Sequence, residues 1–173
     1  MDKYELAKLI QWAGTLRSRK KMQKVVYLLQ AAGCPFDADY GLHHYGPYSS
    51  DVAQTTDVMV QVGLLEEEAV DSGAGKQFNY QLTDKAQESV ADFEKTDAGK
   101  KAAHRLSDYE PRAKTLLHLD AKLLEMAATV AYFWKQTKDW TTAVEKMCQF
   151  KGLKPKDPLT VQAEELAREF LDT

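Results

Sequence analysis

The stretch Met22-Gln-Lys-Val-Val-Tyr-Leu-Leu-Gln-Ala-Ala-Gly33 predicts a helix around which the rest of the chain can be placed. Its apolar residues recur at helical spacing, at Met22, Val25, Val26, Leu29 and Ala32. Gly33 is typical of a helix end. Upstream, Asp2 followed by Glu5 predicts a capping box, and helical spacing carries a first helix to Gly14. The chain therefore opens with two helices, which a basic linker joins.

A short strand, a turn and a third helix are expected after this pair. Apolar and polar residues alternate over residues 40–44 as in a strand, and Gly46-Pro47 then predicts a turn. Ser49 or Ser50 can cap the third helix, which ends at Gly63. Residues 64–82 follow as a predicted hairpin.

The hairpin consists of two alternating segments, residues 64–70 and 77–82, around the loop Gly73-Ala-Gly75. Thr83 or Asp84 can cap the next helix. A helix-turn-helix followed by a two-stranded wing gives this order of elements. We therefore predict a winged-helix-like domain over residues 1–96.

The second half, residues 97–173, carries no strand signal and predicts a helical C-terminal extension packed on the first domain. Three or four helices are expected between its Pro and Gly residues, which are Pro111, Gly152, Pro155 and Pro158. Asp157 can cap the last helix, whose predicted buried side carries Val161, Leu166 and Phe170. The expected fold class is mainly α, of the α+β type.

One helix of this half, residues 121–134, has apolar residues at nearly every angle instead of on one stripe. We expect it to be central. Two arrangements remain open: the helix is shared between the copies of a homodimer, or it is enclosed within a monomer.

Composition indicates an ordinary globular chain of 173 residues, with 23 Lys and Arg against 26 Asp and Glu. The formal net charge of −3 is too balanced to indicate a nucleic-acid or membrane partner. No basic stretch followed by an apolar run marks a signal peptide, and no apolar segment is long enough to span a bilayer. A soluble, cytoplasmic protein is expected, in which Cys34 and Cys148 are ordinary thiols.

The segment Tyr40–Asp51 is the strongest candidate for a site, because it places three tyrosines and two histidines at a turn that opens a helix. A small hydrolase using His43, His44 and Ser49 is one hypothesis. However, no G-x-S-x-G motif surrounds the serine, so we expect a structural role and no catalytic residues. The four histidines lack metal-ligand spacing, so neither a metal nor a cofactor is expected.

Five cations, Arg17, Arg19, Lys20, Lys21 and Lys24, fall within eight residues at the start of the second helix. Positive charge is unfavourable at a helix start, so a nucleic-acid phosphate or an acidic partner is expected to compensate, unless the segment is a solvated loop. Against duplex DNA, residues 49–75 contain six acidic residues and no Lys or Arg. This segment includes the surfaces that a winged helix presents to the groove.

Three segments, Arg19–Leu29, His43–Val52 and Gly63–Glu66, resemble the Panacea domain superfamily, most closely its uncharacterised YwgA-like branch. The resemblance covers residues 17–95. It implies an antitoxin or chaperone-like adaptor that binds a partner protein, with no known cofactor. The matching motif positions are Lys21, Gln23, Lys24, Tyr27, Tyr45, Gly46, Pro47 and Tyr48.

We therefore expect a protein-interaction module, to which the resemblance gives an antitoxin or adaptor role. It is expected to capture a partner such as a toxin around the Gly46-Pro47 turn or along the C-terminal helices. The residues predicted to contact the partner are Lys21, Lys24, His43, Tyr45 and Tyr48. The first alternative is a DNA-binding regulator that uses the five-cation cluster on phosphates. The second is the small hydrolase.

Overall fold

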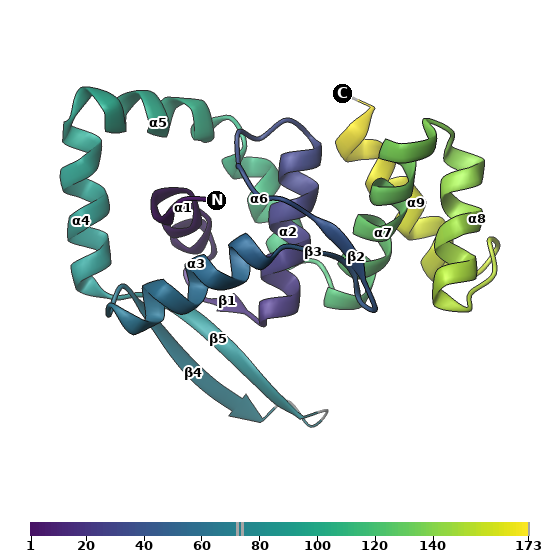
Figure 1. Cartoon of the computed structure of the whole chain (residues 1–173), viewed down its shortest axis with the longest axis horizontal. Helices are drawn as coiled ribbons and strands as arrows, with labels where there is room; N and C mark the ends of the chain where they lie inside the picture. The colour runs from purple at the N-terminus through teal and green to yellow at the C-terminus, as the bar shows by residue number, and fades with distance from the viewer. Residues whose placement is uncertain (72, 74, 173) are drawn as a thin grey trace.

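Helix α2 (Arg19–Ala31) lies at the centre of the fold, between elements from both halves of the chain (Figure 1). The computed structural model describes residues 1–71, 73 and 75–172. Every residue from Met22 to Leu29 is buried, whereas the sequence pattern predicted one buried face. Gln23 and Lys24 lie inside this run, so their polar groups need partners from the chain itself.

The other helices predicted in the N-terminal half are confirmed. Helix α1 (Lys3–Ala13) begins with the expected capping box between Asp2 and Glu5. Ser49 caps α3 (Ser50–Gln61) by accepting a hydrogen bond from the backbone N–H of Val52. Thr83 caps α4 (Asp84–Lys95). The chain therefore contains the predicted series of capped helices.

The antiparallel sheet contains the predicted hairpin, formed by β4 (Leu65–Asp71) and β5 (Lys76–Leu82). A third strand, β1 (Leu16–Arg17), pairs with β5 and gives the strand order β1-β5-β4. The sequence did not predict β1, because two residues are too short for an alternating pattern. This strand ties the connection between α1 and α2 to the sheet.

The prediction of a turn at Gly46-Pro47 is wrong, because these residues belong to a strand. A second hairpin is formed by β2 (Gly41–His43) and β3 (Gly46–Tyr48), so that the turn itself is at His44-Tyr45. Proline is tolerated in this two-stranded sheet because both strands are edges. Gly46 has a φ of +82°, a conformation that favours glycine.

The C-terminal half contains more helices than the three or four predicted. Residues 97–172 form α5 (Asp97–Ser107), α6 (Glu110–His118), α7 (Ala121–Thr137), α8 (Trp140–Lys151) and α9 (Pro158–Leu171). Pro111 marks the start of α6 as predicted, whereas the breaks after α6 and α7, at Leu119-Asp120 and Lys138-Asp139, contain neither Pro nor Gly and were missed. Along the described residues, no helix combines the length and apolar character needed to cross a membrane.

Helix α7 is central to the C-terminal half, as its apolar pattern predicted. It packs against α8 and α9, and also against α2 and β3 of the N-terminal half. One continuous cluster of buried side chains includes residues from both halves. In α9, Leu166 and Phe170 are buried as expected, but Val161 is exposed, which contradicts its predicted burial. The β2–β3 hairpin thus lies between α2 and α7 (Figure 1).

Replacing Gly46 with alanine should destabilise the protein by about 2–4 kcal/mol, because backbone strain and overpacking add together. A Cβ atom here would collide with Oγ1 of Thr129 on α7. Urea unfolding measures the change. Gly63→Ala is the matched control, because Gly63 also has a positive φ of +70° but no atom near the added Cβ. Equal losses at Gly46 and Gly63 would contradict the tight hairpin–α7 contact.

Candidate functional site

A cavity of about 310 Å³ opens between the start of α2, the β2–β3 hairpin and α3. Its lining combines three kinds of side chain. The cations are Arg19, Lys20 and Lys24, the hairpin rings are His43, His44, Tyr45 and Tyr48, and the apolar or small residues include Met22, Val52 and Thr56. Aromatic rings and cations therefore surround one apolar hollow.

Four of the five predicted contact residues line this cavity, namely Lys24, His43, Tyr45 and Tyr48. The fifth, Lys21, points elsewhere: its Nζ donates a hydrogen bond of 3.0 Å to the backbone oxygen of Leu117. The ring of His43 stacks on that of Tyr48, with centroids 4.8 Å apart. The structure thus gathers the hairpin residues predicted from the sequence and separates Lys21 from them.

Polar side chains of α2 fix the backbone at the end of the hairpin. The Gln23 side-chain amide donates to the Ser49 carbonyl at 2.8 Å and accepts from the Ser49 N–H at 2.9 Å. Lys24 Nζ donates to the Pro47 carbonyl at 2.5 Å. Gln23 and Lys24 are only 5% and 2% exposed, so these hydrogen bonds satisfy polar groups that water cannot reach.

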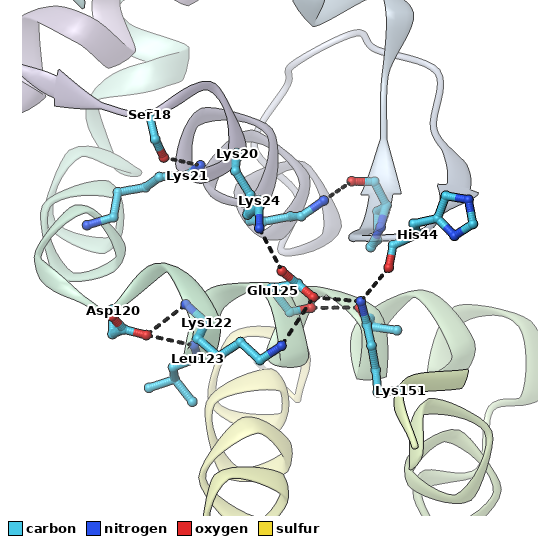
Figure 2. A network of polar contacts seen from close by, with 12 residues as sticks. Ser18, Lys20, Lys21, Lys24, His44, Asp120, Lys122, Leu123, Glu125 and Lys151 are labelled. Carbon is cyan, nitrogen blue, oxygen red and sulfur yellow. Dashed lines mark hydrogen bonds and ion pairs between the residues drawn. The ribbon is translucent and has the colours of Figure 1, made fainter. Parts of the chain in front are cut away.

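Glu125 of α7 is a buried carboxylate beneath the hairpin, surrounded by lysines from three helices (Figure 2). Its Oε1 lies 2.6 Å from Lys151 Nζ, and its Oε2 lies 3.4 Å from Lys20 Nζ. Lys151 Nζ also donates to the His44 carbonyl at 2.8 Å. Glu125 therefore connects α7, α8, α2 and the hairpin in one polar network.

Sequence reasoning missed this network. The available signal was an acidic residue in the middle of a helix that is apolar at nearly every angle, since such a residue needs a cationic partner. Burial alone would raise the pKa of the Glu125 carboxyl. The hydrogen bond and charge of Lys151, with the charges of Lys122 and Lys20, outweigh burial and hold this pKa below its ordinary value.

Burial lowers the pKa of the Lys24 ammonium to about 8. The negative charge of Glu125 opposes this effect, and the positive charges of Lys151 and Lys20 add to it. Among the described residues, no carboxylate forms an ion pair with Lys24, whose recorded acceptor is the Pro47 carbonyl. Lys24 thus faces the cavity as a cation without an ion-pair partner.

The five-cation cluster is divided between two faces of the protein. Arg19 forms ion pairs with Asp57 at 2.7 Å and with Glu67 at 2.8 Å. Arg17 and Lys21 line a separate hollow, away from the cavity. Acidic residues of α3 and β4 therefore compensate part of the positive charge at the start of α2, for which the sequence analysis considered only an external partner or a solvated loop.

The structure also shows where the residues of the hydrolase hypothesis lie. Ser49 is fully buried, and its Oγ accepts the capping hydrogen bond from the Val52 N–H. His43 and His44 are exposed on the hairpin. Within residues 1–71, 73 and 75–172, no three His, Cys, Asp or Glu side chains are grouped to hold a metal ion.

No family model matches the chain. A search of curated proteins finds a relative in Bacillus subtilis (strain 168) that is 26% identical over 129 residues. The alignment covers 75% of this chain and 72% of the relative. The relative is the uncharacterized protein YwgA. This similarity agrees with the resemblance to the YwgA-like branch, and the name assigns no activity.

Substituting Glu125 with glutamine should cost about 2–4 kcal/mol of unfolding free energy near neutral pH, because it removes the carboxylate from a buried cluster of lysines. Glu110→Gln is the matched control, since the Glu110–Lys114 pair is exposed and should contribute less than about 1 kcal/mol. Urea unfolding of both variants measures the two losses. A loss in Glu125→Gln no larger than in the control would contradict the network's role.

The same variant should also change the pH dependence of stability. Because the folded pKa of Glu125 is lowered, its charge contributes stability above the ordinary glutamate pKa, about 4.3, and loses that contribution as the pH falls further. The difference between wild type and Glu125→Gln should therefore be full at pH 7 and shrink toward pH 3. Urea unfolding across this range measures it, and a difference that grew in acid would contradict the assignment.

Proposed function

We propose that this chain is a protein-interaction module that captures a partner protein at the β2–β3 hairpin and the cavity beside it. The resemblance to Panacea proteins gives this role a specific form, that of an antitoxin or chaperone-like adaptor whose partner could be a toxin. The N-terminal half, with its helices α1, α2 and α3 and the β1-β5-β4 sheet, supports a winged-helix-like arrangement of this module.

The observation that carries the proposal is a pair of exposed tyrosines on a fixed hairpin at a cavity. Tyr45 is 61% exposed and Tyr48 is 37% exposed, whereas large aromatic side chains are usually buried more deeply. Tyrosines on a rigid backbone lose little conformational entropy on binding and contribute a large contact area. The hairpin is therefore preorganised as a binding surface.

The Lys20 side chain adds to this surface, because its Nζ lies 3.9 Å from the centroid of the Tyr45 ring. This cation–π contact orients the most exposed ring of the hairpin. The His43 ring supports Tyr48 in the same way by stacking. Both tyrosines are thus held in place before any partner binds.

The DNA-binding alternative has less support. Arg19 and Lys20 form ion pairs with carboxylates, and Lys21 and Lys24 donate hydrogen bonds to backbone carbonyls. Four of its five proposed phosphate contacts are therefore engaged within the chain. The acidic segment 49–75 includes β4, whose exposed side is rich in glutamate. Binding to duplex DNA at low salt would revive this alternative. The hydrolase alternative lacks an exposed nucleophile at Ser49.

Affinity purification of the tagged chain from its native cell, at physiological salt and with nuclease treatment, tests the proposal. A partner protein should co-purify in stoichiometric amount, and the double variant Tyr45→Ala/Tyr48→Ala should recover it at least about tenfold less well. Val161→Ala, which removes an exposed side chain on α9, should leave recovery unchanged. Circular dichroism confirms that each variant is folded.

Equal recovery by the wild type and the double tyrosine variant would reject the hairpin as the binding surface. Nucleic acid recovered without a protein would instead support the DNA-binding alternative.

A further inference from the structure

The cavity beside the hairpin is positively charged. Its lining includes three cations and, among the described residues, no aspartate or glutamate. Arg19 and Lys20 form ion pairs with carboxylates that lie outside the lining. The third cation, Lys24, has no such partner within the described chain. The charge of the cavity is therefore complementary to an anion.

Lys24 is the cation that would bind the anion. Lys24 is 2% exposed, and its Nζ donates a hydrogen bond to the Pro47 carbonyl at 2.5 Å. An ammonium group carries three N–H donors, and Glu125, whose negative charge acts on Lys24, forms no ion pair with it. An anionic group in the cavity would supply a direct ion-pair partner for Lys24.

The lining of the cavity also favours a ligand with an apolar group close to that anion. Met22 and Val52 are buried at 1% and 0% exposure and line the same hollow as Lys24. The Thr56 hydroxyl there is occupied, because it donates to the Val52 carbonyl at 2.7 Å. At about 310 Å³ the cavity lies at the lower end of ligand pockets, so the anion and the apolar group must be a few bonds apart.

We infer that the cavity binds the C-terminal residue of a partner chain, with its carboxylate beside Lys24 and Lys20 and an apolar or aromatic side chain against Met22 and Val52. This inference rests on the proposed function. A C-terminal apolar residue carries both required groups on one Cα atom. An internal aspartate or glutamate carries the carboxylate without the apolar side chain.

The test uses N-acetyl-L-phenylalanine, which presents a free carboxylate and an aromatic side chain, as the probe of the cavity. Its titration into the full chain at pH 7, followed by ¹H–¹⁵N correlation spectra, should give millimolar binding with shifts at Gly46, Lys24 and Thr56. The neutral N-acetyl-L-phenylalaninamide should bind about tenfold more weakly, since it lacks the charge that Lys24 recognises.

Two variants separate recognition from folding. Lys24→Met should lose most of the preference for the acid over the amide, because the buried ammonium is lost while the side chain keeps a similar length. Lys20→Gln, at an exposed position that tolerates a polar residue, should reduce the preference for the acid without unfolding the chain. It keeps the inference testable if Lys24→Met fails to fold.

A pH series gives a readout that a structural role for Lys24 would not produce. The acid should lose its advantage over the amide as the pH rises from 7 to 9.5, because Lys24 deprotonates in this range while the probe's carboxylate stays ionised. The charged groups around Lys24 are Glu125, Lys151 and Lys20. Glu125, whose pKa is lowered, stays ionised throughout this range.

Equal binding of acid and amide to the wild type, or no binding of either, overturns the inference. Tighter binding of the α-amide of N-acetyl-L-aspartic acid, whose free side-chain carboxylate mimics an internal acidic residue, also overturns it. The proposed function can fail separately. If the chain binds the probe but captures no partner protein, the anion-binding cavity is supported and the protein-interaction role is rejected. If the chain captures a partner through Tyr45 and Tyr48 but does not bind the probe, only the inference of C-terminal residue binding is rejected.

Discussion

A helix buried around its whole circumference must provide a partner for every polar group that it carries, and α2 carries two such side chains. Gln23 and Lys24 satisfy this constraint by binding the backbone of Ser49 and Pro47. Unpaired, these groups would oppose folding by several kcal/mol. The same hydrogen bonds place the end of the β2–β3 hairpin beside α2 and so create the cavity. The same contacts therefore serve both the core and the cavity.

Glu125 extends this constraint to the C-terminal half. Its carboxylate is removed from water at a cost that the surrounding lysines offset, so the network contributes geometry more than net stability. Lys151 contacts both Glu125 and the His44 carbonyl, which fixes α8 relative to the hairpin turn. The β2–β3 hairpin is thus held on one side by α2 and on the other by α7 and α8. The position of the hairpin is therefore set by contacts within the chain.

Local sequence signals predicted the elements that local chemistry controls. Caps and periodicity gave α1, α2, α3 and the β4–β5 hairpin, and the apolar helix at residues 121–134 gave the centre of the second half. The residues of the site were predicted only in part. Lys20 and Lys24, four residues apart, face the cavity together, whereas Lys21 is rotated by about 100° from Lys20 and faces elsewhere. The missed features, β1, strand β3 and the Glu125 network, depend on partners far along the chain.

The bond between Lys151 and the His44 carbonyl spans 107 positions of sequence. During synthesis on a ribosome, the hairpin emerges long before the lysine that anchors its turn. At about 5–20 residues per second, that delay lasts about 5–20 seconds. Throughout this interval α2 can hold the end of the hairpin at Pro47 and Ser49, but the His44 carbonyl lacks its Lys151 donor. The hairpin turn can therefore be fixed to α8 only after the residues up to Lys151 have left the ribosome.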